Sequence, residues 1–171
     1  MGVIELATEK DRSQILGLFK AQKGREYCAW DEGYPSDETI SFDLSRDALY
    51  VMKENGKVIA AISIEEDEDV DKLDCWNRDL FPGGELARVA VDPSMQSRGI
   101  GRQMMEHGLK ALKERGYKST HFLVNKYNVK AIKCYAAFGF NVVGECFMYD
   151  QDFFCYEKKA VILRRGDRNG T

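Results

Sequence analysis

The stretch from Leu86 to Arg102, which reads LARVAVDPSMQSRGIGR, constrains the fold more than any other part of the sequence. Its first six residues are mostly apolar and are expected to form a strand. Asp92-Pro93 ends that strand, because proline lacks an N–H donor and restricts the residue before it. Helical periodicity begins at Ile100 and continues on one face to a stop at Gly116. The stretch predicts a strand, a glycine-bearing loop and a helix.

The loop between this strand and helix has the features of an anion-binding loop. Glycines let the backbone approach a ligand closely, and unpaired N–H groups at a helix N-terminus attract anionic oxygens. A Walker A loop is excluded, because Gly101 is followed by Arg102-Gln103 rather than by Lys and then Ser or Thr. A dinucleotide fingerprint is excluded too, because Met104 stands where a third small residue is needed. The loop is expected to hold phosphate groups in another arrangement.

Length and composition indicate a single domain and argue against nucleic-acid binding, membrane spans, disulfides and metal sites. The 171 residues are enough for a single core, and we expect one domain over residues 1–165 with a frayed polar tail at 166–171. The net charge of −3 argues against a nucleic-acid-binding surface. No segment has the ~20 apolar residues of a membrane span, and no signal-peptide core is present. The five scattered cysteines and two distant histidines predict neither a disulfide frame nor a metal site. A cytoplasmic protein is expected.

Periodicity predicts a mixed α/β fold. The hairpin signal Asn55-Gly56 and the parallel crossover expected around the helix at 98–116 give a mostly antiparallel sheet that is flanked by helices. The acidic run at 65–74 is expected to be a loop. The expected strands are 3–7, 48–53, 57–64, 86–91, 120–125, 141–148 and 153–163, and the expected helices start near Asp11, after Ser36, at Ile100 and at Asn128.

Two motifs give the sequence a family resemblance. Gln96, Gly99 and Gly101 match Gln/Arg-x-x-Gly-x-Gly/Ala, and the stretch Asn128 to Phe140 matches Asn-x-x-Ala-x-x-x-Tyr-x-x-x-Gly-Phe at every marked position. Both motifs and the order of the elements resemble the GNAT superfamily of N-acetyltransferases over about residues 3–163. The resemblance implies a central sheet in which the parallel strand pair is splayed. It also implies acetyl-CoA as the cosubstrate and no metal.

The implied reaction is transfer of acetyl from acetyl-CoA to a primary amine, by direct attack of the amine on the thioester. The acceptor stays open among small amines, amino acids and protein amines. A non-catalytic acyl-CoA-binding regulatory module and transfer of a different acyl group are the alternatives. The family often forms homodimers, and the last strand is the candidate interface.

The resemblance also implies where the cofactor binds. Main-chain groups of the strand that ends at Val91 would pair with pantetheine, and the N–H groups of residues 97–102 would hold the pyrophosphate. Asn128 would contact the cofactor or cap its helix, and Asn125 lies at the neighbouring strand end. The expected cofactor-binding residues are Val89, Ala90, Val91, Gln96, Ser97, Arg98, Gly99, Ile100, Gly101, Arg102, Asn125, Asn128, Ala131 and Tyr135.

Tyr135 and Glu85 are the expected catalytic residues. Tyr135 matches the family's general acid, which protonates the departing sulfur, although its place in an apolar helix stripe equally fits core packing. Glu85 stands at the spacing of the base in one branch of the family; a surface carboxylate is the other interpretation, and Glu26 and Glu32 are alternative bases. A base matters most for an alkyl amine, since a pKa of ~10.4 leaves about one molecule in 2,500 neutral at pH 7.

The aromatic loop at residues 25–35 has the position of the family's acceptor-pocket wall. Tyr27, Trp30 and Tyr34 are the expected substrate-binding residues, with Trp30 equally suited to anchoring the loop to the core. The turn at 147–152 is a second candidate wall. The acidic run at 65–74 is either a solvated loop or a device that draws in a cationic amine.

Overall fold

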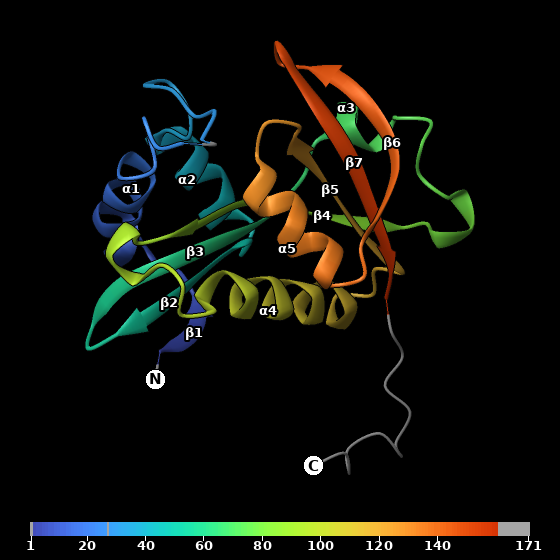
Figure 1. The fold of residues 1–171 in the computed structure, drawn as a ribbon. Helices are drawn as coiled ribbons and strands as arrows, with labels where there is room; N and C mark the ends of the chain where they lie inside the picture. The colour runs from blue at the N-terminus through green and yellow to red at the C-terminus, as the bar shows by residue number, and fades with distance from the viewer. Residues whose placement is uncertain (1, 27, 161–171) are drawn as a thin grey trace.

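The computed structural model describes residues 2–26 and 28–160, and within them the strands form one seven-stranded sheet (Figure 1). The strand order is β1-β2-β3-β4-β5-β7-β6, and every neighbouring pair is antiparallel except β4 and β5. This confirms the mixed, mostly antiparallel sheet that the sequence predicted. The strands are β1 (Val3–Leu6), β2 (Leu49–Glu54), β3 (Lys57–Glu65), β4 (Gly83–Val91), β5 (Ser119–Asn125), β6 (Asn141–Met148) and β7 (Gln151–Lys159).

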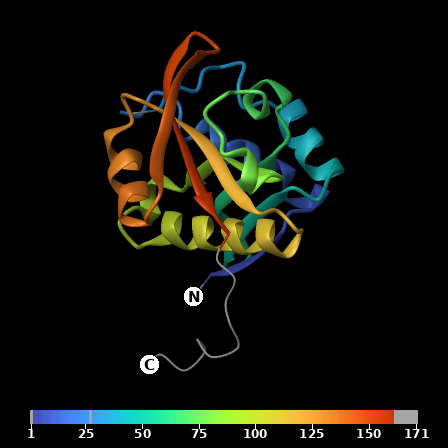
Figure 2. The same ribbon diagram turned by 90° about the vertical axis from the view of Figure 1, so that its right-hand side faces the viewer.

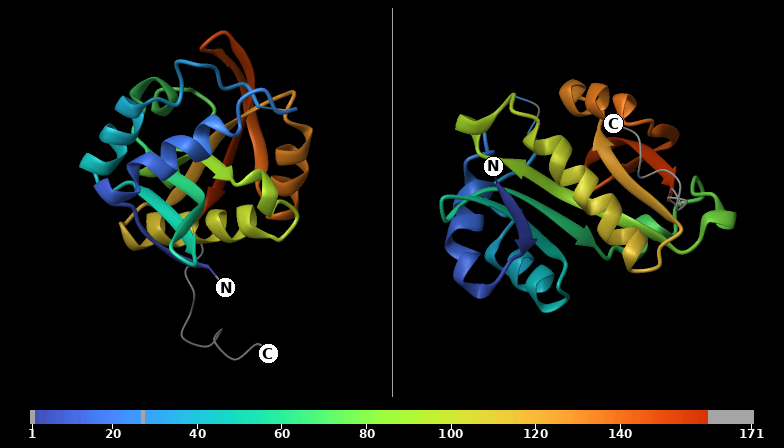
Figure 3. Two further views of the ribbon diagram at one scale, coloured as in Figure 1. Left: turned by 90° about the vertical axis from the view of Figure 1, so that its left-hand side faces the viewer. Right: turned by 90° about the horizontal axis from the view of Figure 1, so that it is seen from below.

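Helices cover both faces of the sheet (Figure 3). On one face, α1 (Arg12–Lys20) and α2 (Asp37–Ser45) pack on β2–β4 through a core that includes Ile15, Phe19 and Ile40. On the other face, α4 (Ile100–Glu114) crosses the sheet, and α5 (Val129–Ala137) packs over Phe122 of β5. Short 3₁₀ turns are Glu9–Asp11, Arg78–Leu80 and Pro93–Met95, and a short helix α3 is Glu68–Asp71.

Two local sequence signals, a helix cap and a hairpin turn, form the structures that they predicted. Ser36 caps α2, since its hydroxyl accepts a 3.3 Å hydrogen bond from the N–H of Thr39 while Thr39 Oγ1 accepts one of 3.0 Å from the N–H of Ser36. Asn55-Gly56 joins β2 to β3 as a hairpin, with both residues at positive φ. Helix α4 also fits closely on the sheet: a Cβ added to Gly108 would lie 2.9 Å from the Leu86 side chain.

The parallel pair of β4 and β5 forms a fork. The two strands pair only through Gly83 with Ser119, Gly84 with Thr120 and Glu85 with His121. Beyond Glu85, β4 continues along β3 while β5 continues along β7, so the strands separate (Figures 1 and 2). Helix α5 lies in front of the gap in Figure 1. The splayed strand pair that the family resemblance implied is therefore present.

Three expectations about element bounds were wrong. Strand β4 begins at Gly83 rather than Leu86, because the two glycines are not a free turn: a Cβ added to Gly84 would lie 2.5 Å from Leu112 of α4. The acidic run contains α3, whose N–H groups at Asp69 and Val70 donate to the Asp67 carboxylate. The last strand was expected at 153–163, and β7 begins earlier, at Gln151, and runs to Lys159; residues 161–163 lie outside the described part of the chain.

The last strand also lies inside the sheet. Strand β7 pairs with β5 on one side and β6 on the other, so β6 forms this edge of the sheet and the last strand is not an exposed edge for a dimer. The tail at 166–171 lies outside the described residues. Over the ranges 2–26 and 28–160, no helix is both long and apolar enough to cross a membrane.

Candidate active site

A cleft of about 870 Å³ opens at the fork between β4 and β5. This volume is within the usual range for a small-molecule site. Its walls come from β4, β5, α5, the segment between α1 and α2, and the turn between β6 and β7. The residues that the sequence analysis singled out and that line it are Trp30, Tyr34, Glu85, Val89, Val91, Gln96, Gly101, Asn125, Asn128, Ala131 and Tyr135.

One edge of β4 is open to this cleft. From Leu86 to Val91 the strand has no partner in β5, because the pairing stops at Glu85. A bulge takes Arg88 and Val89 out of register with β3, and Arg88 has a φ of +52°. The main-chain groups along the β5-facing edge of this stretch, apart from the Val91 carbonyl, are therefore available to an extended ligand.

The N-terminus of α4 presents free donors beside the cleft. Gly99 precedes the helix at a φ of +73°, and the N–H groups of Ile100, Gly101 and Arg102 donate no hydrogen bond within residues 2–26 and 28–160. These are the orphan donors of a helix N-terminus, and they attract anions together with the helix dipole. The geometry fits the predicted phosphate-binding loop.

The arginine side chains of this loop form ion pairs with glutamates of the protein. Arg98 pairs with Glu54 at 3.4 Å, and Arg102 pairs with Glu106 at 3.2 Å. Ile100, the first residue of α4, is buried, and Ser97 is exposed with a φ of +64°. None of Ser97, Arg98, Gly99, Ile100 and Arg102 lines the cleft, whereas Gln96 and Gly101 do.

Gln96 and Val91 are bonded to each other. The Gln96 amide donates to the Val91 carbonyl at 3.3 Å and accepts from Lys130 Nζ at 3.1 Å. The Gln22 amide donates to the same carbonyl at 2.9 Å. Main-chain groups of Val89 and Val91 were expected to pair with pantetheine, and here two side-chain amides already occupy the Val91 carbonyl. The Ala90 side chain is buried on the α1 face, so of this residue only the backbone remains near the cleft.

Two asparagines fix the end of β5 and the start of α5. Asn128 caps α5, because its Oδ1 accepts a 3.1 Å hydrogen bond from the N–H of Ala131. Asn125 donates to Gln151 Oε1 at 3.0 Å and accepts from the N–H of Tyr127 at 2.9 Å. The capping role expected for Asn128 is confirmed, and both amides lie at the cleft wall.

Tyr135 is half-buried in the cleft wall. Its ring lies 4.6 Å from that of Phe122, the residue that follows His121 at the end of the paired part of β5. Burial, with smaller contributions from Cys134 and Tyr156, raises the pKa of the Tyr135 hydroxyl above its usual value. The phenol therefore keeps its proton at neutral pH and is a potential proton donor. Cys134 also lines the cleft, but burial raises the pKa of its thiol, which leaves it unactivated.

Glu85 is buried at the apex of the fork, with 7% of its surface exposed. It faces Glu65 across β3 and β4, and its Oε2 accepts no hydrogen bond within the described part of the chain. Burial, and then the carboxylates of Glu65, Asp67 and Asp71, raise the pKa of Glu85 to about 9. The surface-carboxylate interpretation is wrong: Glu85 is a buried acid that lines the cleft.

A buried ion network beneath the cleft was missed by the sequence analysis. Arg88, 6% exposed, donates to both oxygens of Asp43 at 2.8 and 2.9 Å and pairs with Glu65. Arg46 binds Asp43 at 2.8 Å, and the Ser63 hydroxyl donates to it at 2.7 Å. The sequence signal that could have revealed this network is Arg88, a single arginine within an apolar strand. A buried arginine needs a buried acidic partner.

The loop at 28–35 is held to this network and to the core. The Trp30 ring lies 5.5 Å from that of Phe19, so Trp30 both anchors the loop and lines the cleft. The Tyr34 hydroxyl accepts a 2.9 Å hydrogen bond from Arg88. Tyr27 lies outside the described residues. Of the alternative bases, Glu26 lines the cleft, whereas the Glu32 side chain is 97% exposed beside Lys23.

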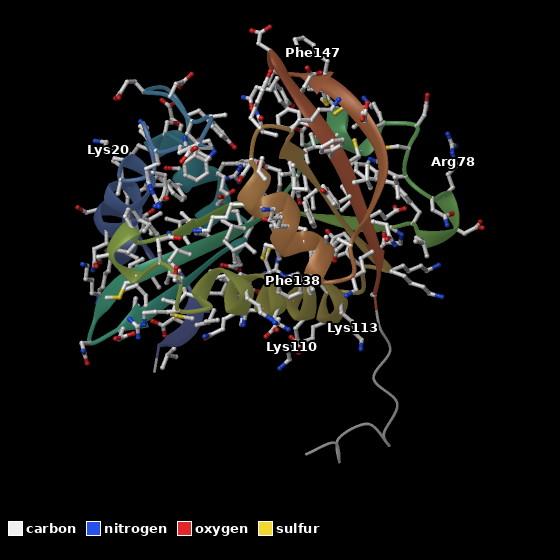
Figure 4. All side chains as sticks on the ribbon, in the orientation of Figure 1. Lys20, Arg78, Lys110, Lys113, Phe138 and Phe147 are labelled. Atoms are coloured by element: carbon white, nitrogen blue, oxygen red, sulfur yellow. The ribbon has the colours of Figure 1, made fainter. Side chains whose placement is uncertain are left out.

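The turn between β6 and β7 reaches the acidic segment across the cleft. Tyr149 donates a 2.5 Å hydrogen bond to Asp67 Oδ2, and both residues line the cleft. Phe147, labelled in Figure 4, marks this end of the hairpin. The turn at 147–152 is thus a wall of the cleft, as predicted. Among the described residues, no group of three or more His, Cys, Asp and Glu side chains is placed to hold a metal ion.

The sequence and fold agree with one family. The model of the acetyltransferase (GNAT) family matches residues 14–140, which include β4, the loop, α4, β5 and α5. The chain belongs to this family. The match covers both predicted motifs and the whole fork.

Relatives and solved structures also support membership of this family. An alanine N-acetyltransferase of ribosomal protein bS18 from Salmonella typhimurium is 41% identical over 56 residues, which are 33% of this chain and 38% of that protein. The crystal structure of the ribosomal-protein-S18-alanine N-acetyltransferase from Escherichia coli matches with a TM-score of 0.72 at 20% identity, covering 97% of this chain and 98% of that one. An N-acetyltransferase from Thermoplasma acidophilum in complex with coenzyme A matches with a TM-score of 0.71 at 17% identity, covering 93% and 99%. The chain thus matches less than half the length of its curated relative in sequence, while the folds agree over nearly their full lengths.

Proposed function

We propose that this protein is an acetyl-CoA-dependent N-acetyltransferase that acetylates a primary amine by direct attack on the thioester. The observation that carries the proposal is the fork: one cleft is lined by Gly101 at the N-terminus of α4, by the open edge of β4, and by Tyr135 and Glu85. Membership of the GNAT family and the named activities of the relatives support it.

The residues at the fork fit a CoA thioester. The N–H groups of residues 99–102 would hold the pyrophosphate, and the open edge of β4 around Val89 would pair with the pantetheine amides. Asn125, Asn128 and Ala131 would line the other side of the same channel. When bound, acetyl-CoA supplies the activated acetyl group.

Glu85 is the proposed base. The amine enters as an ammonium ion and gives one proton to the Glu85 carboxylate, which passes it to solvent. The neutral nitrogen attacks the carbonyl carbon, the new C–N bond forms and the C–S bond breaks. Because Glu85 has a pKa of about 9 in the free protein, its ionised form is scarce at pH 7 and an incoming cation increases it.

Tyr135 is the proposed acid. Its hydroxyl protonates the departing sulfur, and the second proton of the amine replaces the one that Tyr135 has given. The raised pKa of Tyr135 keeps the phenol protonated until a thiolate forms. A general acid contributes about 10²–10⁴-fold to a rate.

We place the reaction in the cytoplasm, where the five free thiols of the chain stay reduced. A non-catalytic acyl-CoA-binding module would use the same cleft, but it has no need of an unpartnered buried carboxylate at the apex of the fork.

The test measures acetyl-CoA binding by calorimetry and thiol release against a panel of amines on the same sample. Saturable binding together with amine-dependent thiol release supports the proposal. Tight binding without release for any small amine, peptide N-terminus or lysine side chain would indicate the binding module, and absence of binding would contradict both.

A further inference from the structure

The inner end of the cleft has an excess of negative charge. Four carboxylates belong to it: Glu65, Asp67 and Glu85 line the cleft, and Asp71 acts on Glu85 from α3. Glu65 is neutralised, because Arg88 and Arg46 pair with it and with Asp43. The other three have no lysine or arginine within ion-pair distance among residues 2–26 and 28–160.

The partners of Asp67 and Asp71 are neutral. Asp67 accepts from the Tyr149 hydroxyl and from the N–H groups at the start of α3. Asp71 lies 3.1 Å from His121 Nε2, and burial lowers the pKa of that histidine, so it is uncharged at neutral pH. These contacts position the carboxylates without cancelling their charge.

Glu85 adds an independent sign of a missing ligand. Its Oε2 is buried and has no hydrogen-bond partner in the described residues, although the side chain lines the cleft. A buried unpaired carboxylate is costly, so Glu85 mostly holds a proton in the free protein, and it becomes a negative charge when a cation occupies the space beside it. An ammonium group is such a cation.

We propose that the acceptor is an aliphatic amine with a second positive charge, a diamine or longer polyamine, whose reacting nitrogen lies at Glu85 and whose distal ammonium lies against Asp67. This inference rests on the proposed function and names its substrate class. The Tyr149–Asp67 contact joins the two sides of the cleft at this point and keeps the Asp67 carboxylate at the wall. An acceptor with a free carboxylate would meet repulsion there.

The test compares three acceptors of equal chain length whose distal ends are positive, neutral and negative. They are 1,4-diaminobutane, 1-aminobutane and 4-aminobutanoate, each assayed for thiol release with saturating acetyl-CoA. We expect kcat/KM for the diamine to exceed that for 1-aminobutane by about tenfold, as one close charge pair near a protein surface allows. The carboxylate-bearing acceptor should be the poorest of the three.

The Asp67→Asn variant tests whether Asp67 binds the distal ammonium of the acceptor. The asparagine Oδ1 can still cap α3, while its Nδ2 takes the place of Oδ2 and can donate to the Tyr149 hydroxyl oxygen, so the charge is removed and the contact with Tyr149 is kept with reversed direction. This variant should lower kcat/KM for the diamine much more than for 1-aminobutane, so that most of the preference is lost; an effect of the lost charge on Glu85 acts on both acceptors and cancels in their ratio. Glu68→Gln is the matched control: Glu68 is the next residue, 91% exposed beside Lys72 and outside the cleft wall, and its variant should keep the preference.

Each outcome is decisive. Equal kcat/KM for the diamine and the monoamine, or an Asp67→Asn effect of equal size on both, overturns the inference and leaves the proposed transferase standing. Thiol release with an alanine-terminated peptide but with none of the three small amines overturns the inference in the same way. Absence of release with every acceptor, despite acetyl-CoA binding, overturns the proposed function and this inference together.

Discussion

Glu65 and Glu85 face each other across β3 and β4, at the last position before β4 separates from β5. Two like charges directly opposite in a sheet destabilise it. Arg88 and Arg46 pair with Glu65, whereas Glu85 is buried and has no cation within ion-pair distance among the described residues. The fold therefore retains an unfavourable carboxylate where its main cleft begins.

The first prediction concerns stability. Folding raises the pKa of Glu85 from 4.5 to about 9, so the folded state binds its proton more tightly than the unfolded chain. The contribution of Glu85 to stability is therefore greatest below pH 4.5 and falls as the pH rises from 4.5 to 9. Glu85→Gln removes this loss, and we expect it to raise the free energy of unfolding at pH 7 by about 3 kcal/mol and to change it little near pH 4. Urea unfolding at both pH values measures this; equal effects at both would contradict it.

The pH dependence of catalysis follows from the same group. As a base, Glu85 acts only when ionised, so kcat/KM should rise through neutral pH toward about 9. The charged groups that act on it are Glu65, Asp67, Asp71 and Arg88, with neutral His121 beside it on β5. Glu85→Gln should lower kcat by about 10²–10⁴-fold and flatten the rise. A wild-type profile that is flat from pH 6 to 9 would exclude Glu85 as the base.

Tyr135→Phe separates acid catalysis from packing. Phenylalanine preserves the ring contacts with Phe122, Phe140 and Tyr156, so the free energy of unfolding and the Kd for acetyl-CoA should stay near wild type. We expect kcat to fall about 10²-fold, at the lower end for a general acid, because a thiolate is a tolerable leaving group. An unchanged kcat would show that Tyr135 only fills space.

Tyr34→Phe tests how the loop at 28–35 is held. It removes the hydroxyl that accepts from Arg88 and leaves the ring at the cleft wall. One hydrogen bond to a charged group contributes about 1.5–3 kcal/mol. We expect KM for the amine to rise about tenfold, while the Kd for acetyl-CoA stays the same. Equal losses in the affinity for both substrates would mean that the loop supports the whole cleft instead.

Gly99→Ala tests the loop before α4 against a matched control. Gly99 and Gly56 have φ values of +73° and +76°, and an added Cβ meets nothing within 4 Å at either place. Both changes to alanine should therefore cost about 1–2 kcal/mol of backbone strain. Only Gly99→Ala should weaken acetyl-CoA binding in calorimetry, because Gly56 lies in the β2–β3 hairpin. Equal binding by the two variants would place the pyrophosphate elsewhere.

Local signals predicted the order of the long elements. Asn55-Gly56 specifies a turn through its backbone geometry, Ser36 and Asn128 specify caps through their side-chain oxygens, and the structure contains all three. The fork was predicted through the family resemblance, and the pairing of β4 with β5 confirms it. The glycines at 83 and 84 were misinterpreted as a turn, because their reason is the close approach of α4, which sequence periodicity does not show.

The ion pairs and hydrogen bonds of the site could not be predicted from the sequence, because they join residues that are far apart in the chain. Asp43 and Arg88 are 45 residues apart, and Asp67 and Tyr149 are 82 apart, so no spacing rule connects them. The same holds for Gln96, whose motif position indicates a cofactor contact while its amide is bonded to Val91 and Lys130. Charge and hydrogen-bond partners could be assigned only after the fold had brought these segments together.

The most direct test follows the acetyl group itself. Acetyl-CoA labelled in its acetyl group is incubated with the protein and 1,4-diaminobutane, and the products are separated and identified by mass spectrometry. We predict labelled N-acetyl-diaminobutane and an equal amount of free coenzyme A, with both reduced to background in the Glu85→Gln, Tyr135→Phe double variant. Label that stays in acetyl-CoA, or that appears only as free acetate across all amine acceptors, would contradict amine acetylation at the fork.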